Sequence, residues 1–317
     1  MQSKQYGLPY KGSKNKIANW VIEHLPHEHS DYFIDLFAGG CAMSHAALLS
    51  GRYTWVIAND LTDTPAVFKA ACLKEFENYA ATPDKKEFDE HKHTDRGMAI
   101  LFSYTTGCSQ YLWAEDNETK RLATKVVLGS SVHERKNAFN DFIRYLGKTG
   151  GFSKNNDLNK LGKSEVVARL SRIQKLSELN KDSIDQLQPT RFDYRELFFA
   201  GVPDSCLIYA DPPYKNTDSR GYVAFDYDAF ETWLAEMAEK DQPVYISEYT
   251  CPKNCSVVAS TKKLVSINGK ATHKTELLCV QSKFADSCRH GQQSLFSVPA
   301  FNSTEKQNES ETETCES

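Results

Sequence analysis

Apolar and polar positions alternate with strand and helix spacing along the first 60 residues of the chain. Tyr32 to Phe37 is an apolar run that ends in a glycine turn, and Cys41 to Leu49 then carries apolar residues at helical spacing. A second apolar run, Tyr53 to Ala58, ends at Asn59-Asp60. This order of strand, turn, helix and strand predicts the beginning of a doubly wound α/β sheet.

The pattern becomes helical between Leu61 and Gln188, with a glycine-rich polar loop at residues 147–156. Strand patterns return at Cys206–Ala210 and Pro243–Glu248, and an amphipathic helix is predicted between them at Asp228–Glu239.

Two further β-type runs, Lys262–Ile267 and Thr275–Gln281, are separated by Asn268-Gly269, which is typical of a tight hairpin at the edge of a sheet. The predicted organisation is a discontinuous α/β domain, residues 1–60 and 189–284, interrupted by a mostly helical insertion at residues 61–188.

Composition adds an ordinary globular balance, because 40% of the 317 residues are hydrophobic and 25% are charged. No stretch approaches the roughly 18 apolar residues of a membrane span, so a cytoplasmic protein is expected. The nine cysteines lack the spacing of a zinc site or of a disulfide framework, and Cys251 and Cys255 are the only close pair. Reduced thiols and no metal are therefore expected.

Charge is distributed unevenly along the chain, whose formal net charge is -4. The residues from Ala285 onward hold six acids and two bases, so the rest of the chain is balanced. Within that balanced part, Thr119 to Lys175 holds thirteen Lys and Arg against four Asp and Glu. Such an excess fits a surface that neutralises nucleic-acid phosphates, and it also fits a solvated helix face.

The sharpest chemical signal is Asp211-Pro212-Pro213-Tyr214, directly after the strand predicted at Cys206–Ala210. Open α/β sheets bind ligands at the carboxyl ends of their strands. The Asp211 carboxylate and the Pro212 carbonyl are two acceptors for the hydrogens of an aromatic amine, whose lone pair would then be directed at an electrophilic methyl group. Tyr214 offers a flat face on which a base rotated out of a duplex can stack. A rigid turn with a packed tyrosine is the structural alternative.

A second candidate site lies at Asp35 to Gly40, where an acid at a strand end is followed by Gly39 and Gly40. Asp60 ends the next strand about 21 residues after Gly39, a separation at which an acid commonly meets ribose hydroxyls. Because Cys41 occupies the position of a further spaced glycine, the dinucleotide fingerprint is absent, and a nucleoside pocket is preferred to an NAD or FAD site.

Together these motifs resemble the Dam-like, D12-class DNA adenine methyltransferases over nearly the whole chain up to about Lys283. Tyr10 to Lys14 is similar to the N-terminal cofactor motif of that family, Asp35 to Gly40 to its glycine motif and Asp211 to Tyr214 to its D-P-P-Y motif. An insertion between the last two motifs is the class alpha order, in which the insertion is the target-recognition domain. The resemblance implies a Rossmann-like sheet that binds S-adenosylmethionine, and methyl transfer to adenine N6.

The resemblance also implies roles for single residues. Those implied to contact S-adenosylmethionine are Tyr10, Lys14, Asp35, Phe37, Gly39, Asp60, Asp193 and Tyr194; Asp211, Pro212, Pro213 and Tyr214 would hold the target base. Cys41 departs from the family pattern, where a glycine is usual, and its side chain would narrow the cofactor turn.

The insertion offers candidate contacts to double-stranded DNA. Lys148, Lys154, Asn155 and Asn156 lie in the basic polar loop, where lysine suits phosphates and asparagine can read adenine. Tyr111 and Trp113 belong to an aromatic-rich segment that fits either a DNA contact or a helix core.

Three alternatives remain at this point. Methylation of adenine in RNA uses the same chemistry, and a catalytically silent DNA-binding module would keep the fold without the reaction. A glutamine methyltransferase is disfavoured because that reaction is usually associated with N-P-P-Y, whereas this chain has Asp211.

The polar tail from Ala285 is expected to be disordered. Within it, Gln292, Leu295 and Phe296 belong to a pentapeptide that resembles bacterial sliding-clamp ligands, with Gln293 in place of leucine.

Overall fold

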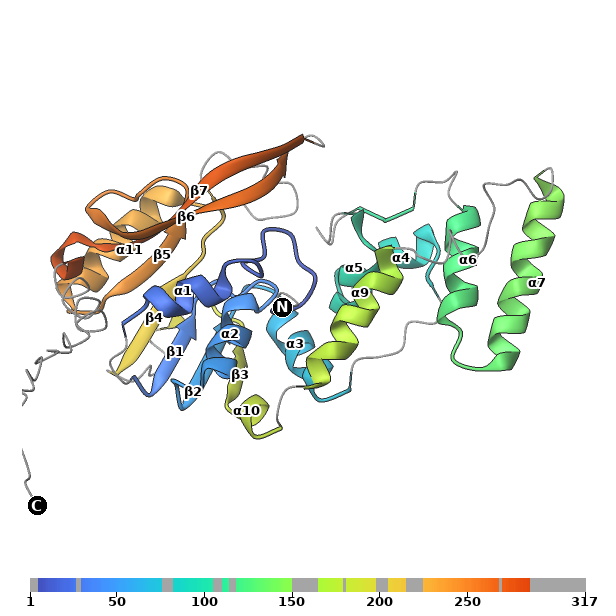
Figure 1. The fold of residues 1–317 in the computed structure, drawn as a ribbon, viewed down its shortest axis with the longest axis horizontal. Helices are drawn as coiled ribbons and strands as arrows, with labels where there is room; N and C mark the ends of the chain where they lie inside the picture. Colours follow the sequence, from blue (N-terminus) through green and yellow to red (C-terminus); the bar gives the residue numbers. More distant parts are fainter. Residues whose placement is uncertain are drawn as a thin grey trace, which may run out of the picture.

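A mixed sheet of seven strands forms the centre of the protein in the computed structural model (Figure 1). The structure describes residues 5–26, 30–75, 82–104, 110–113, 118–149, 165–178, 181–197, 205–214, 225–267 and 270–285. The strands are β1 Tyr32–Asp35, β2 Trp55–Asn59, β3 Leu187–Thr190, β4 Cys206–Ala210, β5 Val244–Glu248, β6 Cys255–Ile267 and β7 Lys270–Gln281.

The strand order is β3-β2-β1-β4-β5-β7-β6. The first five strands of this order pair in parallel, and β7 runs antiparallel to both β5 and β6. β2 and β4 lie on opposite sides of β1, so the strand order reverses at β1. Such a topological switch point is where open α/β sheets bind ligands.

The helices cover both faces of the sheet and fill the long connection between β2 and β3 (Figure 1). They are α1 Ala18–His24, α2 Ala42–Ser50, α3 Thr64–Cys72, α4 Lys85–His91, α5 Arg96–Phe102, α6 Glu118–Leu128, α7 Val132–Lys148, α9 Glu165–Gln174, α10 Lys181–Asp185 and α11 Tyr227–Glu239, with the short helices η4 Lys175–Glu178 and η6 Ser282–Phe284.

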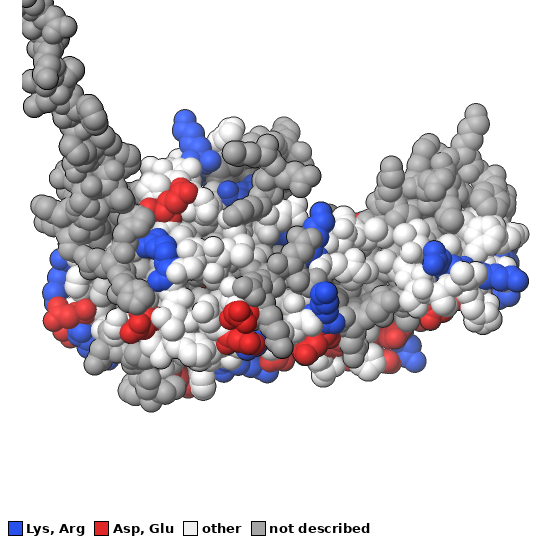
Figure 2. All heavy atoms as spheres, turned by 60° about the horizontal axis from the view of Figure 1, so that its bottom comes forward, with Lys and Arg blue, Asp and Glu red and all other residues white. Residues whose placement is uncertain are grey.

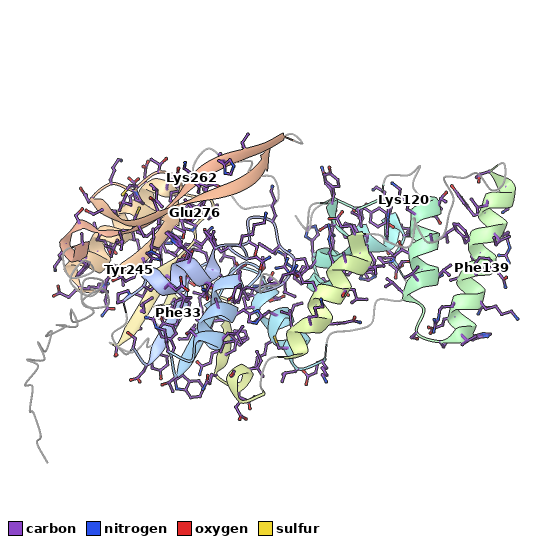
Figure 3. The ribbon with its side chains drawn as sticks, viewed as in Figure 1. Phe33, Lys120, Phe139, Tyr245, Lys262 and Glu276 are labelled. Carbon is purple, nitrogen blue, oxygen red and sulfur yellow. The ribbon has the colours of Figure 1, made fainter. Side chains whose placement is uncertain are left out.

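Alternation along the strands divides the core into two layers. Phe33 and Tyr245, which Figure 3 labels, belong to the layer that packs on α1, α2 and α3. Ile34 and Ile208 belong to the layer beneath α11. Because both faces are covered, β1, β4 and β5 are almost wholly buried, which explains their continuous apolar sequences.

The strands and helices anticipated in the α/β parts are confirmed, and two differences have physical causes. β3 was not anticipated, because Leu187-Gln188-Pro189-Thr190 is short, half polar and contains proline; it pairs with β2 at the sheet edge, where proline is tolerated. β6 begins at Cys255 rather than near Lys262, with a register shift between Val257 and Ala259. The antiparallel β6–β7 pairing is confirmed, and Asn268-Gly269 lies outside the described residues.

The segment between β2 and β3 is helical and has two parts. Residues of α5 and α9 share the larger core with the sheet, whereas α6 and α7 pack on each other through a small core of their own, farthest from the sheet in Figure 1. Trp113 is buried against Phe102 and Tyr111, so both side chains pack on the core. The predicted helix is wrong at this place, because Tyr111 forms an isolated antiparallel β-bridge with Ser103.

Charged side chains of both signs are interspersed on the face drawn in Figure 2. No helix in the described part of the chain has the length and apolar character needed to cross a membrane. The residues after Ala285, including Gln292, Leu295 and Phe296, lie outside the described part.

Candidate active site

Two acids follow the central strands at the same edge of the sheet. β1 pairs in parallel with β4, and the amide of Leu36 donates to the Tyr209 carbonyl at 2.9 Å. Asp35 ends β1 and Asp211 directly follows β4, so both lie at the carboxyl edge of the switch point. The motifs at Asp35–Gly40 and Asp211–Tyr214, far apart in sequence, therefore share one site.

Asp35 is almost fully buried and caps helix α2 from the end of β1. Its Oδ2 atom accepts hydrogen bonds from the Ser44 amide at 2.9 Å and the Ser44 hydroxyl at 2.6 Å. The helix has no capping side chain of its own at Cys41, so Asp35 supplies one. Burial raises the pKa of Asp35 to about 7, although the Ser44 hydrogen bonds oppose this shift.

The glycine turn after β1 is shaped by the N-terminal segment. Gly39 has a φ of +46°, and a Cβ on Gly40 would lie 2.5 Å from the Cβ of Tyr10. The turn therefore has to be glycine where the Tyr10 side chain crosses it. Leu8 donates its amide to the Gly40 carbonyl at 2.7 Å, which fixes this crossing segment on the turn.

Asp60, at the end of β2, holds the same turn from the other side. Its Oδ2 atom accepts the Gly39 amide at 2.9 Å, and its Oδ1 atom accepts the amide and hydroxyl of Thr62 at 2.8 and 2.7 Å. A carboxylate has about four acceptor positions, so these contacts leave room for one hydroxyl donor.

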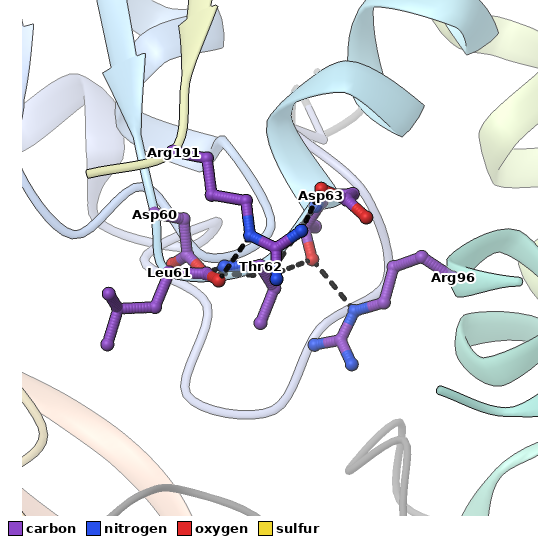
Figure 4. A network of polar contacts seen from close by, with 7 residues as sticks. Asp60, Leu61, Thr62, Asp63, Arg96 and Arg191 are labelled. Carbon is purple, nitrogen blue, oxygen red and sulfur yellow. Dashed lines mark hydrogen bonds and ion pairs between the residues drawn. The ribbon is translucent and has the colours of Figure 1, made fainter. Parts of the chain in front are cut away.

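Two arginines support the loop after Asp60, as Figure 4 shows. Arg96, from α5, donates to the Thr64 hydroxyl at 3.0 Å and to the Tyr10 hydroxyl at 3.3 Å. Arg191, which follows β3, donates to the Leu61 carbonyl at 3.0 Å and pairs with Asp63 on the surface. Arg96 therefore joins the helical segment to both sides of the glycine turn.

Lys14 lies at the centre of the Asp211 motif. Its side chain is 3% exposed, its Nζ is 2.5 Å from Asp211 Oδ1 and 3.4 Å from an oxygen of the fully buried Glu276, and it lies 4.5 Å from the Tyr214 ring centre. Burial opposes the charge of Lys14, but the two carboxylates outweigh it and raise the pKa of Lys14 above its ordinary value. Lys14 therefore remains an ammonium that fixes the Asp211 carboxylate.

Tyr214 and Pro213 are held by residues from three other elements. The Tyr214 hydroxyl donates to Glu276 on β7, and its ring makes an edge contact with Tyr249 at 4.5 Å between ring centres. The Tyr227 hydroxyl, from α11, donates to the Pro213 carbonyl. Burial, reinforced by Asp211 and Glu276, raises the pKa of Tyr214 well above its ordinary value, so it stays a hydrogen-bond donor.

The remaining residues expected near the cofactor are two aromatic residues, Phe37 and Tyr194, and the acid Asp193. Phe37 is half-buried and packs on Tyr194 with 5.4 Å between ring centres, and Tyr194 itself is buried. Asp193 accepts from the amide and the side chain of Arg195, at 2.8 to 3.0 Å. The structure thus places Phe37 and Tyr194 together, and it pairs Asp193 with a neighbouring arginine.

Sequence reasoning missed several residues that build the site. Asn59 donates its amide to the Leu36 and Phe192 carbonyls at 3.1 and 3.0 Å, which ties the ends of β1 and β3 to β2. Glu276 lies within the β-type run Thr275–Gln281, for which the sequence predicts only a strand. The sequence does carry a signal for both residues: Asn59 is an amide at a strand end, and Glu276 is an acid inside an apolar strand. Each is costly to bury without a partner, so each is expected to have one.

Cys41 stands where a glycine was expected and adopts a glycine-like conformation. Its φ is +59°, it is fully buried, and burial raises the pKa of its thiol well above the ordinary value. The side chain is accommodated, at the conformational cost that a non-glycine residue has in this region.

Part of the basic excess of the helical segment serves the fold itself. Arg169 is buried and donates to the carbonyls of Ile100, Leu101 and Ser103 at 2.7 to 3.2 Å, and Arg172 donates to the Tyr6 carbonyl at 2.7 Å. Exposed bases are found on α7, and Lys148 is the last residue of this helix rather than part of the loop predicted at residues 147–156. Lys154, Asn155 and Asn156 lie outside the described residues.

Comparison with known proteins gives one family. The sequence model described as D12 class N6 adenine-specific DNA methyltransferase matches residues 10–274, from the crossing segment through both motifs to β7. No curated protein matches the chain.

Proposed function

This chain belongs to the D12 class of N6 adenine-specific DNA methyltransferases, and from that premise we propose that it transfers the methyl group of S-adenosylmethionine to a flipped-out adenine at the Asp211 motif. The observation that carries the proposal is the buried Lys14–Asp211 contact at the carboxyl end of β4, the strand that pairs in parallel with β1 before the glycine turn. It joins the N-terminal and catalytic motifs into one site.

The residues of the glycine turn fit the proposed cofactor. Gly39 and Gly40 leave the room that the Tyr10 side chain needs to cross the turn, and Asp60 retains an acceptor position suited to a ribose hydroxyl. Phe37 and Tyr194 supply apolar surface beside the same edge. The cofactor, when bound, supplies an electrophilic methyl group on a sulfonium.

The protein's own contribution at the target base is orientation. One Asp211 oxygen and the Pro212 carbonyl accept the two N6 hydrogens, so that the nitrogen lone pair is directed toward the methyl group. Lys14 fixes the Asp211 carboxylate, Glu276 fixes Tyr214, and Tyr227 fixes the carbonyl of Pro213. Holding acceptors before the substrate arrives avoids reorganisation during transfer.

Incubation with methyl-labelled cofactor and either duplex DNA or structured RNA tests this proposal and its closest alternative. We expect label in N6-methyldeoxyadenosine of the DNA, and much less in the RNA. Label that appeared mainly in RNA adenine would favour the RNA enzyme, and no label in either would favour the silent binding module.

DNA contacts are proposed for the helical segment, residues 61–188, through Lys148, Lys154, Asn155 and Asn156.

For the tail, we propose sliding-clamp binding through Gln292, Leu295 and Phe296, on the sequence resemblance alone. Replacing Leu295 and Phe296 with alanine in the full chain should abolish saturable binding to the host clamp; equal binding by both proteins would contradict it.

A further inference from the structure

The β6–β7 hairpin extends beyond the sheet that it closes. Residues Leu277–Val280 of β7 pair with β5 as well as β6, whereas residues 270–276 pair with β6 alone. At about 3.3 Å per residue, this free part is roughly 20 Å long. Figure 1 shows it reaching past the other strands, on the side where the helical segment lies. We call residues 261–267 and 270–276 the arm.

The arm carries four lysines and one acid, Glu276, whose partners are Lys14 and the Tyr214 hydroxyl. From Cys255 to Thr275 the sequence has four lysines and no Asp or Glu. The register sets Lys263 directly opposite Lys274, and like charges directly opposite each other destabilise an antiparallel pair. Among the described side chains, no acid forms an ion pair with Lys274. An anionic partner would remove this cost.

The face of the arm that carries Lys274 contacts the Asp211 motif through Tyr249. Lys274 Nζ lies 4.5 Å from the centre of the Tyr249 ring, and Tyr249 contacts the ring of Tyr214. Because strand positions alternate between faces, Lys263 and Lys274 share a face with Glu276, which holds the Tyr214 hydroxyl. Lys262 belongs to the opposite face, and Figure 3 labels it beside Glu276 on the hairpin.

We propose that this face of the arm binds the phosphates of the DNA strand that carries the target base, an inference that rests on the proposed function. A base stacked at Tyr214 leaves its flanking phosphates near Tyr249 and Lys274. Lysine contacts to phosphate position DNA without reading its sequence, so the arm supplies register and affinity, and base readout is left to other residues. Lysines that only protect an open strand edge from aggregation are the alternative.

Salt dependence of DNA binding distinguishes these two roles. We expect Lys263→Gln/Lys274→Gln to lower the slope of log affinity against log salt by about 1.8, because each phosphate contact contributes about 0.9. If the two proteins bound DNA equally at 1 M salt, the variant would therefore bind it about 60-fold more weakly than the unmodified chain at 0.1 M salt. The matched control is Lys253→Gln/Lys262→Gln, which removes equal charge from the other face and from a surface pair with Glu231.

The control should leave the slope unchanged, and Lys263→Arg/Lys274→Arg should restore it. Equal slopes for the two glutamine variants would overturn the arm proposal, as would a loss that arginine does not restore. Cofactor affinity, measured on every variant, checks that the site is folded. Methyl transfer by the unmodified chain is measured in parallel: its absence overturns the proposed function, whereas normal transfer with an unchanged slope overturns only the arm.

Discussion

Single residues in this site are held by contacts that span the whole chain. The Lys14–Asp211 pair joins residues 197 positions apart, and Glu276 joins the same cluster from β7. Sequence reasoning placed Lys14 beside the cofactor; the structure shows its ammonium on the Asp211 carboxylate. A spacing pattern could not predict this contact, because it depends on how the N-terminal segment crosses the sheet.

Asp35 gives a prediction for stability as a function of pH. Its pKa is about 7 in the folded protein against 3.8 for an ordinary aspartate, so the folded state binds an extra proton between these values. Stability should therefore fall as pH rises from about 4 to about 7 and then level off. Asp35→Asn removes this slope, since asparagine can still accept the Ser44 amide.

Urea unfolding of both proteins at pH 5 and pH 8 tests this prediction. The stability of Asp35→Asn relative to the natural chain should rise by roughly 2 to 3 kcal/mol between the two pH values, at about 1.4 kcal/mol per pKa unit. A difference that stayed constant with pH would contradict the raised pKa.

Cys41 gives a second prediction at the residue scale. Because its φ is +59°, glycine should be favoured over alanine at this position, although alanine retains a side chain. We expect Cys41→Gly to be about 1 to 2 kcal/mol more stable than Cys41→Ala. Thermal unfolding of the two variants measures this difference, and a more stable alanine variant would show that packing outweighs backbone strain.

At the scale of elements, apolar patterning predicted the strands that are buried on both faces and the helices beside them. It failed for β3, whose sequence is polar and proline-containing, since pairing with β2 and not local propensity makes it a strand. The carboxyl-edge location of Asp35 and Asp211 followed from the parallel topology. The acid inside an apolar strand marks Glu276 as unusual, but its contacts and those of Tyr227 could not be predicted, because they depend on strand register and on helix placement.

The loop after β2 is where the helical segment meets the glycine turn, and it supplies a third prediction. Arg96→Ala removes hydrogen bonds to Thr64 and Tyr10 in a half-buried place, and it should weaken S-adenosylmethionine binding about tenfold, at roughly 1.5 kcal/mol for a charged hydrogen bond. Arg191→Ala is the matched control, because its contacts with the Leu61 carbonyl and with Asp63 are both exposed, and exposed contacts contribute little.

Calorimetric titration of both variants with the cofactor measures the difference. Comparable affinities for Arg96→Ala and the control would show that the turn is positioned without the helical segment.

On the scale of the whole molecule, the arm extends from the sheet in the direction in which the helical segment lies (Figure 1). If both contact one DNA duplex, their phosphate contacts are independent and their effects on the salt slope should add. Lys148→Ala/Lys154→Ala should lower the slope by about 1.8, and combining it with Lys263→Gln/Lys274→Gln should lower it by about 3.6. A combined effect no larger than either alone would mean that the two regions do not bind the same duplex together.

The central claim is that Asp211 orients adenine N6 for methyl transfer, and one comparison tests it most directly. The chain and its Asp211→Asn variant, which keeps the size of the side chain, are given methyl-labelled S-adenosylmethionine and duplex DNA under single-turnover conditions, and N6-methyldeoxyadenosine is measured over time. We predict that the variant binds the cofactor normally and transfers methyl groups at least about 100-fold more slowly. Transfer at a near-normal rate, or label on a base other than adenine, would contradict the account.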